Sequence, residues 1–257
     1  MRYAVLADVH ANLHALEAVL AHAGPVDGHL VAGDLVGYGP FPNECVSRLA
    51  EIGAICVAGN HDLMVRGDLD ATRCIPLGRT SVAWTRRVLR DDVRAYLAAL
   101  PGRLDVDGSI VVAHGSLDDP CEYTARPEQA VDQLERLPAR SGLLVLGHTH
   151  RAWACDGAGR VLRDGGTGGL PLPDRVVLNP GAVGQSRELR VRARYIELDT
   201  ERRHAIFHAV PYDTRAVRAA LRRRGLAPGS YHLRPGPRGT ARRLLRRVAR
   251  FDAPTGR

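Results

Sequence analysis

Five short segments of the sequence concentrate side chains that can bind metal ions. Each directly follows a short apolar run, and together they are Asp8-Val9-His10, Gly33-Asp34, Gly59-Asn60-His61-Asp62, His114-Gly115 and Gly147-His148-Thr149-His150. Oxygen and nitrogen donors without sulfur suit Mn, Fe, Co, Ni or Zn, and they argue against a thiolate site or an all-oxygen calcium cage. The segments therefore predict a transition-metal site.

Seven of these side chains are candidate ligands, and they are Asp8, His10, Asp34, Asn60, His114, His148 and His150. A single ion takes three or four protein ligands, so this set indicates two ions that share a bridging carboxylate, for which Asp34 is the obvious candidate. Two cations about 3.5–4 Å apart suit in-line displacement at phosphorus, because they activate a bridging water and neutralise charge on the phosphoryl oxygens.

The spacing within two segments indicates how the ligands are presented. In extended backbone, residues i and i+2 lie on the same side. We therefore expect Asp8 with His10, and His148 with His150, each to present two donors to one face.

Hydrolysis of a phosphoester also needs a proton for the leaving oxygen. His61, next to Asn60, is placed to supply that proton or to bind a phosphate oxygen as imidazolium. Asp62 either orients His61 or caps the next helix, and we favour the cap.

An alternation of short apolar runs with helical patterns positions these segments. Buried strands are predicted at 3–7, 29–32, 54–58, 109–113 and 143–146, and helices at 13–23, 42–52, 79–90, 91–99 and 127–137. This alternation is typical of an α/β domain. The carboxyl ends of the strands in such a sheet face a shared crevice, so segments spread over more than half the chain can meet there.

The second half of the chain indicates a mixed or antiparallel sheet. A hairpin is predicted from 151–155 and 160–163, and further strands from 175–178, 192–198 and 203–210. The Gly/Pro-rich stretch at 165–173 lacks the spacing of a phosphate-binding loop, so we interpret it as a surface connection.

From Thr214 onward the sequence is basic and helical in pattern. Thr214 is predicted to cap a helix that runs to Arg224, and Thr240 opens a second helix with apolar residues on one face and arginines on the other. We favour a helix docked on the domain with a solvated arginine face. The alternative is a patch that binds nucleic acid or an acidic partner, although no aromatic residues interleave with these arginines.

Composition excludes several classes of protein. The 257 residues are 45% hydrophobic and 25% charged, which excludes a disordered or fibrous chain. No apolar run approaches the roughly 20 residues of a membrane span, so we expect no membrane association. The five cysteines form no C-x-x-C pair, which argues against a disulfide scaffold and predicts a reducing cytoplasm. The net charge of +8 comes entirely from arginine, which indicates either anionic partners or a compositional bias.

Taken together, the motifs resemble the calcineurin-like metallophosphoesterase superfamily. The ordered set D-V-H, G-D-L-V-G-Y-G, G-N-H-D, V-A-H-G-S and G-H-T-H is most similar to small bacterial phosphodiesterases related to diadenosine tetraphosphatase, and N-P-G-A-V-G-Q at 179–185 also matches. The resemblance implies a four-layer α/β/β/α sandwich of two mixed β-sheets flanked by helices. We expect this domain to span residues 1–213, followed by an Arg-rich helical extension over 214–257.

The resemblance also implies roles for the individual side chains. The first metal would be bound by Asp8, His10, Asp34 and His150, the second by Asp34, Asn60, His114 and His148, and the catalytic histidine would be His61. The cofactors are two divalent transition-metal ions, with manganese favoured over Fe, Ni, Co or Zn.

The expected function is a metal-dependent phosphodiesterase that acts by attack of a metal-bridging hydroxide on a phosphorylated small molecule or nucleotide. A dinucleoside polyphosphate hydrolase, a protein phosphatase, and a non-enzymatic module that binds RNA or an acidic partner through the basic tail are the alternatives. The oligomeric state is left open.

Overall fold

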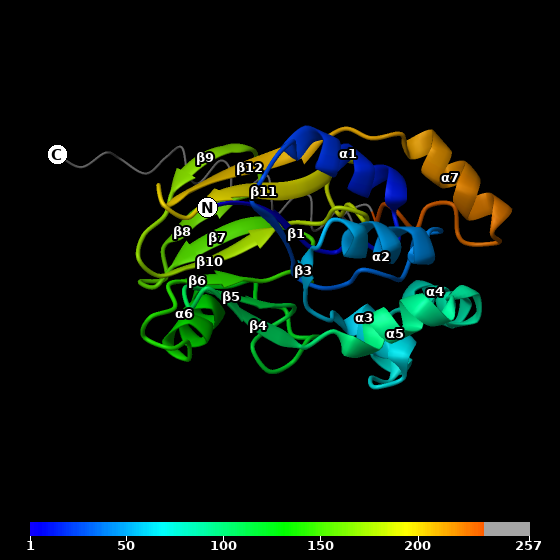
Figure 1. Ribbon diagram of the computed structural model, residues 1–257, viewed down its shortest axis with the longest axis horizontal. Coiled ribbons are helices and arrows are strands. Elements are labelled where there is room, and N and C mark those ends of the chain that lie inside the picture. The colour runs from blue at the N-terminus through cyan, green and yellow to red at the C-terminus, as the bar shows by residue number, and fades with distance from the viewer. Residues whose placement is uncertain (234–257) are drawn as a thin grey trace.

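The computed structural model describes residues 1–233, which form two six-stranded β-sheets stacked between helices (Figure 1). The strands within this range are β1 (Arg2–Leu6), β2 (Gly28–Val31), β3 (Ile55–Cys56), β4 (Arg103–Val106), β5 (Ile110–Ala113), β6 (Leu143–Val145), β7 (Ala152–Asp156), β8 (Val161–Asp164), β9 (Gly168–Pro171), β10 (Val176–Pro180), β11 (Ala193–Asp199) and β12 (His204–Val210). The helices are α1 (Leu13–Ala23), α2 (Pro42–Glu51), α3 (Asn60–Arg66), α4 (Pro76–Val88), α5 (Asp91–Ala99), α6 (Pro127–Glu135), α7 (Thr214–Arg223) and the short 3₁₀ helix η1 (Ala71–Arg73).

Both sheets are mixed. Sheet A has the strand order β3-β2-β1-β11-β12-β9, in which β1, β2 and β3 are parallel and the later strands are antiparallel. Sheet B has the order β4-β5-β6-β10-β7-β8, with β5, β6 and β10 parallel. All the predicted ligand segments follow the carboxyl ends of parallel strands in one sheet or the other.

Three apolar layers hold the sandwich together. Side chains such as Val5, Val145 and Phe207 fill the space between the sheets. The outer face of sheet A packs against α1 and α2, and the outer face of sheet B packs against α6 through Leu134. Burial of apolar area on both faces of each sheet explains why the strands read as continuous apolar runs. The predicted four-layer α/β/β/α architecture is confirmed.

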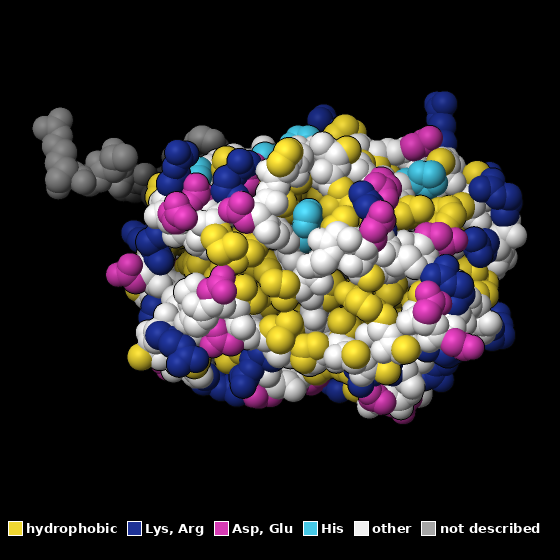
Figure 2. Space-filling view, viewed as in Figure 1, with side chains coloured by type: hydrophobic (Ala, Val, Ile, Leu, Met, Phe, Trp, Pro, Cys, Tyr) yellow, Lys and Arg dark blue, Asp and Glu magenta, His cyan; other side chains and the backbone are white. Residues whose placement is uncertain are grey.

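Charge is spread over the surface. On the face shown in Figure 2, arginines and acidic side chains alternate around the rim while hydrophobic and uncharged groups occupy the middle. None of the helices within residues 1–233 is long and apolar enough to cross a bilayer.

Several sequence predictions need correction. The stretch at 165–173 is more than a surface connection, because it contains β9, which pairs with β12 at the edge of sheet A. Sequence reasoning also missed β4 and gave no bounds for α3, the helix that Asp62 was expected to cap. The cap of α7 is Asp213 instead of Thr214, since the Asp213 carboxylate accepts hydrogen bonds from the backbone N–H groups of residues 215 and 216.

The helix α7 packs on the body of the domain. Val217 and Leu221 contact Trp84 of α4, and Arg224 lies over the rings of Phe41 and Trp84. The domain boundary at residue 213 stays a prediction. The second basic helix expected from Thr240 lies outside the described residues.

Candidate metal centre

The five predicted segments meet at the carboxyl ends of the strands. Asp8 and His10 follow β1, Asp34 follows β2, Asn60 and His61 open α3 directly after β3, His114 follows β5, and His148 and His150 follow β6. All eight of these residues are at most 7% exposed. The structure therefore brings together every residue that the sequence nominated for the site.

The first donor cluster combines Asp8, His10, Asp34 and His150, whose ligand atoms all lie within 4.8 Å of one another. His150 Nε2 lies 3.3 Å from Asp8 Oδ1, and His10 Nε2 lies 3.6 Å from Asp34 Oδ2. The two imidazole Nε2 atoms of His10 and His150 are only 3.1 Å apart.

The second donor cluster contains Asp34, His114 and His148, so Asp34 belongs to both clusters. His114 Nε2 lies 3.3 Å from Asp34 Oδ2 and 3.0 Å from the side-chain oxygen of Asn60. Asn60 is thereby placed beside this second cluster, as the sequence predicts.

Backbone carbonyls select which ring nitrogen of each histidine is free to bind a cation. The Nδ1–H groups of His10 and His150 donate to the carbonyls of Val36 (3.2 Å) and Gln185 (2.7 Å). Their Nε2 lone pairs then face each other at 3.1 Å, which is repulsive unless a cation lies between or beside them.

The second cluster follows the same principle. The Nδ1–H of His114 donates to the Ala32 carbonyl at 2.6 Å, which leaves Nε2 toward Asp34 and Asn60. His148 is reversed, because its Nε2–H donates to the Cys121 carbonyl at 3.1 Å and leaves Nδ1 free. Carbonyl-fixed imidazoles of this kind are the usual environment of metal-ligating histidine.

Burial also leaves carboxylate oxygens without partners. Within residues 1–233, Asp8 Oδ2, Asp34 Oδ2 and His61 Nδ1 are buried and have no hydrogen-bond partner. Burying such atoms unpaired costs free energy, so they mark a place that a bound cation would stabilise. The donor set and its geometry fit divalent cations.

The electrostatics of the cluster agree with that fit. Burial lowers the pKa of His10 and of His148 to about 3, so both rings are neutral at physiological pH and can act as ligands. Burial alone would lower the pKa of His114, but the charge of Asp34 outweighs it and raises this pKa to about 9. A cation bound between His114 and Asp34 would take the place of that proton.

The backbone at the centre is strained. Five of the seven predicted ligands have left-handed φ values: Asp8 (54°), His10 (47°), Asp34 (57°), His148 (63°) and His150 (56°). The expectation of extended backbone within the Asp8–His10 and His148–His150 segments is therefore wrong. A non-glycine residue in this region costs about 1 kcal/mol or more, and such residues gather at functional sites.

A neighbouring glycine has no room for a side chain. A Cβ at Gly59 would lie 2.2 Å from Asp34 Oδ1 and 2.3 Å from the Asp34 backbone nitrogen. Only glycine lets β3 end this close to the shared carboxylate.

The two residues after Asn60 have separate roles. The backbone N–H of His61 donates to Asp34 Oδ1 at 2.8 Å, and His61 Nε2 lies 3.4 Å from Cys74 Sγ. Asp62 accepts hydrogen bonds from the backbone N–H groups of Leu35, Val36 and Gly59 instead of contacting the His61 ring. The bond from the Gly59 N–H, at 2.9 Å, caps the first turn of α3, and so the cap interpretation of Asp62 is confirmed.

Sequence reasoning missed two polar neighbours of the centre, Arg187 and Tyr123. Arg187 Nη2 lies 3.4 Å from His150 Nε2, and its Nη1 donates to the Tyr123 hydroxyl at 3.1 Å. After burial, the positive charge of Arg187 is the next cause that lowers the pKa of His150 well below its ordinary range. The only signal in the sequence was the position of Arg187 two residues after the N-P-G-A-V-G-Q segment.

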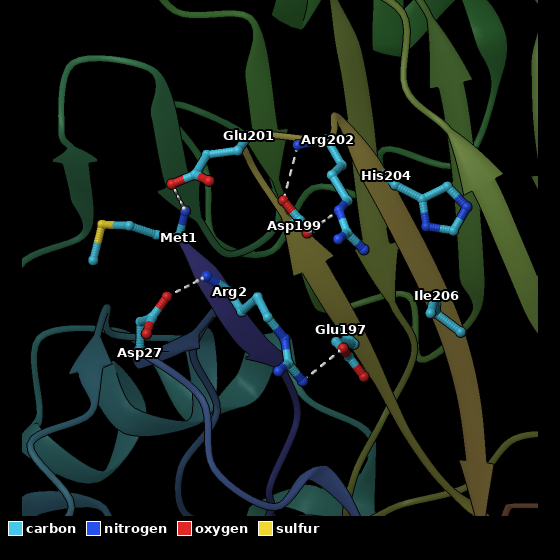
Figure 3. A pocket seen from close by; sticks show the side chains of 9 residues that line it. All are labelled: Met1, Arg2, Asp27, Glu197, Asp199, Glu201, Arg202, His204 and Ile206. Carbon is cyan, nitrogen blue, oxygen red and sulfur yellow. Dashed lines mark hydrogen bonds and ion pairs between the residues drawn. The ribbon is translucent and has the colours of Figure 1, made fainter.

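A separate cavity of about 450 Å³ lies at the opposite, amino end of β1 (Figure 3). We call it the amino-end pocket, and its lining residues are Met1, Arg2, Asp27, Glu197, Asp199, Glu201, Arg202, His204 and Ile206. Its charges pair with one another, as Arg2 does with Glu197 at 2.9 Å and the terminal amine does with Glu201 at 3.0 Å. It contains none of the predicted site residues.

Comparison with known proteins identifies a family and a relative whose sequences are similar to this chain. The family model for the calcineurin-like phosphoesterase superfamily domain matches residues 1–203. An uncharacterized protein from Methanocaldococcus jannaschii is 30% identical over 202 residues, covering 76% of this chain and 82% of that protein.

Solved structures agree with the family match. The crystal structure of a metallophosphoesterase from Sphaerobacter thermophilus is 35% identical, with a TM-score of 0.80 over 90% of this chain and 97% of that chain. A structure provisionally assigned as a diadenosine tetraphosphatase is 19% identical, with a TM-score of 0.55 over 82% of this chain and 94% of that chain, and shares the fold.

Proposed function

This chain belongs to the calcineurin-like phosphoesterase superfamily and is a phosphoester-hydrolysing enzyme, and we propose that its substrates are phosphodiesters. The observation that carries the proposal is the pair of buried donor clusters that share Asp34. A diester carries a single negative charge, and its hydrolysis needs charge neutralisation and an activated water, which such a centre suits.

We assign the two cations to specific donors. Asp8, His10, Asp34 and His150 hold the first, and Asp34, Asn60, His114 and His148 hold the second. This assignment accounts for the facing Nε2 lone pairs of His10 and His150 and for the unpartnered oxygens of Asp8 and Asp34. Divalent ions bound there supply a Lewis acid for the phosphoryl oxygens and lower the pKa of water toward about 7. Manganese is the proposed metal.

The residues of the chain supply orientation and a proton. Asp34 accepts the His61 backbone N–H and so holds this histidine beside the reacting phosphoryl group. His61, protonated where it faces the anionic phosphoryl group, then donates that proton to the leaving oxygen as the ester bond breaks and is left neutral, the form that burial favours by lowering its pKa. The carbonyls of Val36, Ala32, Cys121 and Gln185 keep the imidazole rings in fixed orientations throughout.

The test uses full-length protein purified without metal and reloaded with Mn²⁺, followed by elemental analysis and release of nitrophenol from bis(p-nitrophenyl) phosphate. We expect about two ions per chain and metal-dependent turnover. Protein that holds two ions and cleaves only the monoester p-nitrophenyl phosphate would contradict the diesterase assignment. Parallel assays with Fe²⁺, Co²⁺, Ni²⁺ and Zn²⁺ decide the metal.

The same chemistry could act on other classes of phosphorylated substrate. A dinucleoside polyphosphate or a phosphoprotein would present similar phosphoryl groups, and both belong in the substrate screen. Binding of RNA or an acidic partner through the basic tail concerns residues outside the described range. The five cysteines are free, which supports the proposal of a reducing cytoplasmic setting.

A further inference from the structure

Arg187 lies on a loop that faces the candidate metal centre. Its guanidinium contacts His150 Nε2 at 3.4 Å and the Gln185 side-chain oxygen at 3.4 Å, while a third contact reaches the Tyr123 hydroxyl at 3.1 Å. A planar guanidinium with several N–H donors is suited to bind two oxygens of a phosphoryl group at once. Its position beside a ligand of the first cluster puts these donors where the substrate phosphoryl group must lie.

Tyr123 presents an aromatic ring next to the second cluster. Its ring centroid lies 4.2 Å from that of His148 with an interplanar angle of 46°, yet 49% of the residue is exposed. Large hydrophobic side chains are mostly buried in this fold, so a half-exposed ring packed on a proposed metal ligand is notable. One face of the ring rests on His148, and the exposed part is available to another planar group.

The loop that carries Arg187 is held by the segment after α7. The Ser186 backbone N–H donates to the Tyr231 carbonyl and the Leu233 N–H donates to the Ser186 carbonyl, both at 3.0 Å. The Gln185 side chain donates to the Ser230 carbonyl at 3.1 Å. These bonds fix the backbone on which Arg187 is mounted, and a preorganised arginine loses less entropy when it binds.

We propose that Arg187 and Tyr123 form a substrate-recognition pair, in which Arg187 binds the phosphoryl oxygens and Tyr123 stacks on an aromatic group esterified to the same phosphorus. The substrate class is thus an aryl or nucleoside phosphodiester. The two side chains are in contact, with Arg187 Nη1 3.1 Å from the Tyr123 hydroxyl, so the phosphate and aromatic subsites adjoin each other. This inference rests on the proposed phosphoesterase site.

The test measures binding of two phosphonates that cannot be hydrolysed, methylphosphonate and phenylphosphonate, by calorimetry on the full-length, metal-loaded protein. Wild type should bind phenylphosphonate more tightly. Arg187→Gln should weaken both ligands by about 10- to 100-fold, the range expected for a charge-assisted hydrogen bond. Tyr123→Leu should weaken phenylphosphonate by about tenfold and leave methylphosphonate unchanged.

Matched variants separate recognition from folding. Arg190→Gln removes an exposed arginine from the same loop and should leave both affinities unchanged. Tyr123→Phe keeps the ring and should retain the preference for the phenyl group. Elemental analysis of every variant should still give two ions per chain, since neither Arg187 nor Tyr123 is an assigned ligand.

The outcomes distinguish this inference from the proposed function. Arg187→Gln with wild-type affinity for both phosphonates, or Tyr123→Leu that weakens both equally, would overturn the recognition pair. Wild type that binds both phosphonates with the expected dependence on the two residues, but fails to hydrolyse any phosphodiester, would overturn the proposed function and leave the binding assignment standing.

Discussion

The two ends of β1 differ in whether their charged groups are buried and whether they are paired. At its carboxyl end, the metal centre buries carboxylates and imidazoles with unpartnered atoms on a strained backbone. At its amino end, the amino-end pocket pairs its charged groups locally, and the carboxylate of Glu201 stays 84% exposed (Figure 3). Buried polar groups without partners cost free energy, whereas solvated ion pairs cost almost nothing.

This difference shows where to look for function. Both regions are rich in charge, and the amino-end pocket is a cavity of about 450 Å³. Of these two regions, only the metal centre buries polar atoms without hydrogen-bond partners. This arrangement lowers stability unless cations bind to those atoms. The free-energy cost of burying unpaired polar groups therefore indicates the functional site better than the presence of a cavity does.

The largest expected effect comes from the shared carboxylate. Asp34→Asn can still accept the His61 N–H, but a neutral amide cannot bridge two cations. We expect loss of both ions and a fall in activity of more than about 10⁴-fold. Loss of a single proton-transfer group costs at most about 10⁴-fold. Elemental analysis and diester kinetics measure this.

The matched control is a carboxylate in the amino-end pocket. Asp199→Asn should retain two ions and full activity. Equal metal loss in Asp34→Asn and Asp199→Asn would erase the contrast between the two regions.

The next largest effect is expected at His61. His61→Gln removes the proton donor without removing an assigned ligand, so turnover should fall by about 10²- to 10⁴-fold while metal content stays near two per chain. Metal loss matching that of Asp34→Asn would refute the separate role of His61.

Metal removal should destabilise the whole domain. Chelation leaves the buried carboxylates and the facing imidazoles unsatisfied, and an ion present at a thousandfold excess over its Kd contributes about 4 kcal/mol. Removal of both ions then costs about 8 kcal/mol, so for a chain of this size we expect Tm to fall by about 20 °C on addition of EDTA, measured by calorimetry. A Tm that does not move after complete removal of metal would show that the strained backbone is stable by itself.

The smallest effect is expected in the amino-end pocket. Glu201→Gln breaks an exposed ion pair with the terminal amine, and such pairs contribute little. The shift in Tm should stay below about 2 °C and kcat/KM should not change. A larger change in kcat/KM would mean that the two ends of β1 are coupled.

The sequence was sufficient for the donor residues and for the layers that hold them. A short apolar run that ends in Asp, Asn or His is a local pattern, and parallel strands bring such ends together in any sandwich of this type. Asp8, Asp34 and His114 could therefore be placed without knowledge of their contacts.

The structural features that the sequence did not predict depend on contacts between residues distant in the chain. The positive φ of His10 and His148 goes with hydrogen bonds from their backbone N–H groups to Asp34 O at 2.9 Å and Asp8 Oδ1 at 3.1 Å, which no local pattern announces. The strand β9 depends on its pairing with β12 at the edge of sheet A. A Gly/Pro-rich stretch has little intrinsic tendency to form a strand. Arg187 and Tyr123 are 64 residues apart, and no local pattern links them.

The pairing of β1 with β11 has a consequence for how this protein is made. Val183 N–H donates to the Ala7 carbonyl and Gly184 N–H donates to the Asp8 carbonyl, so the turn bearing the earliest donors is completed by residues translated much later. A ribosome that has reached residue 175 has already produced all seven donors and β2, which pairs with β1 on one side, but it has not yet produced β11, which pairs with β1 on the other. The turn that bears Asp8 and His10 is therefore complete only after residues late in the domain have been made, and long-range pairing of this kind forms slowly compared with a helix.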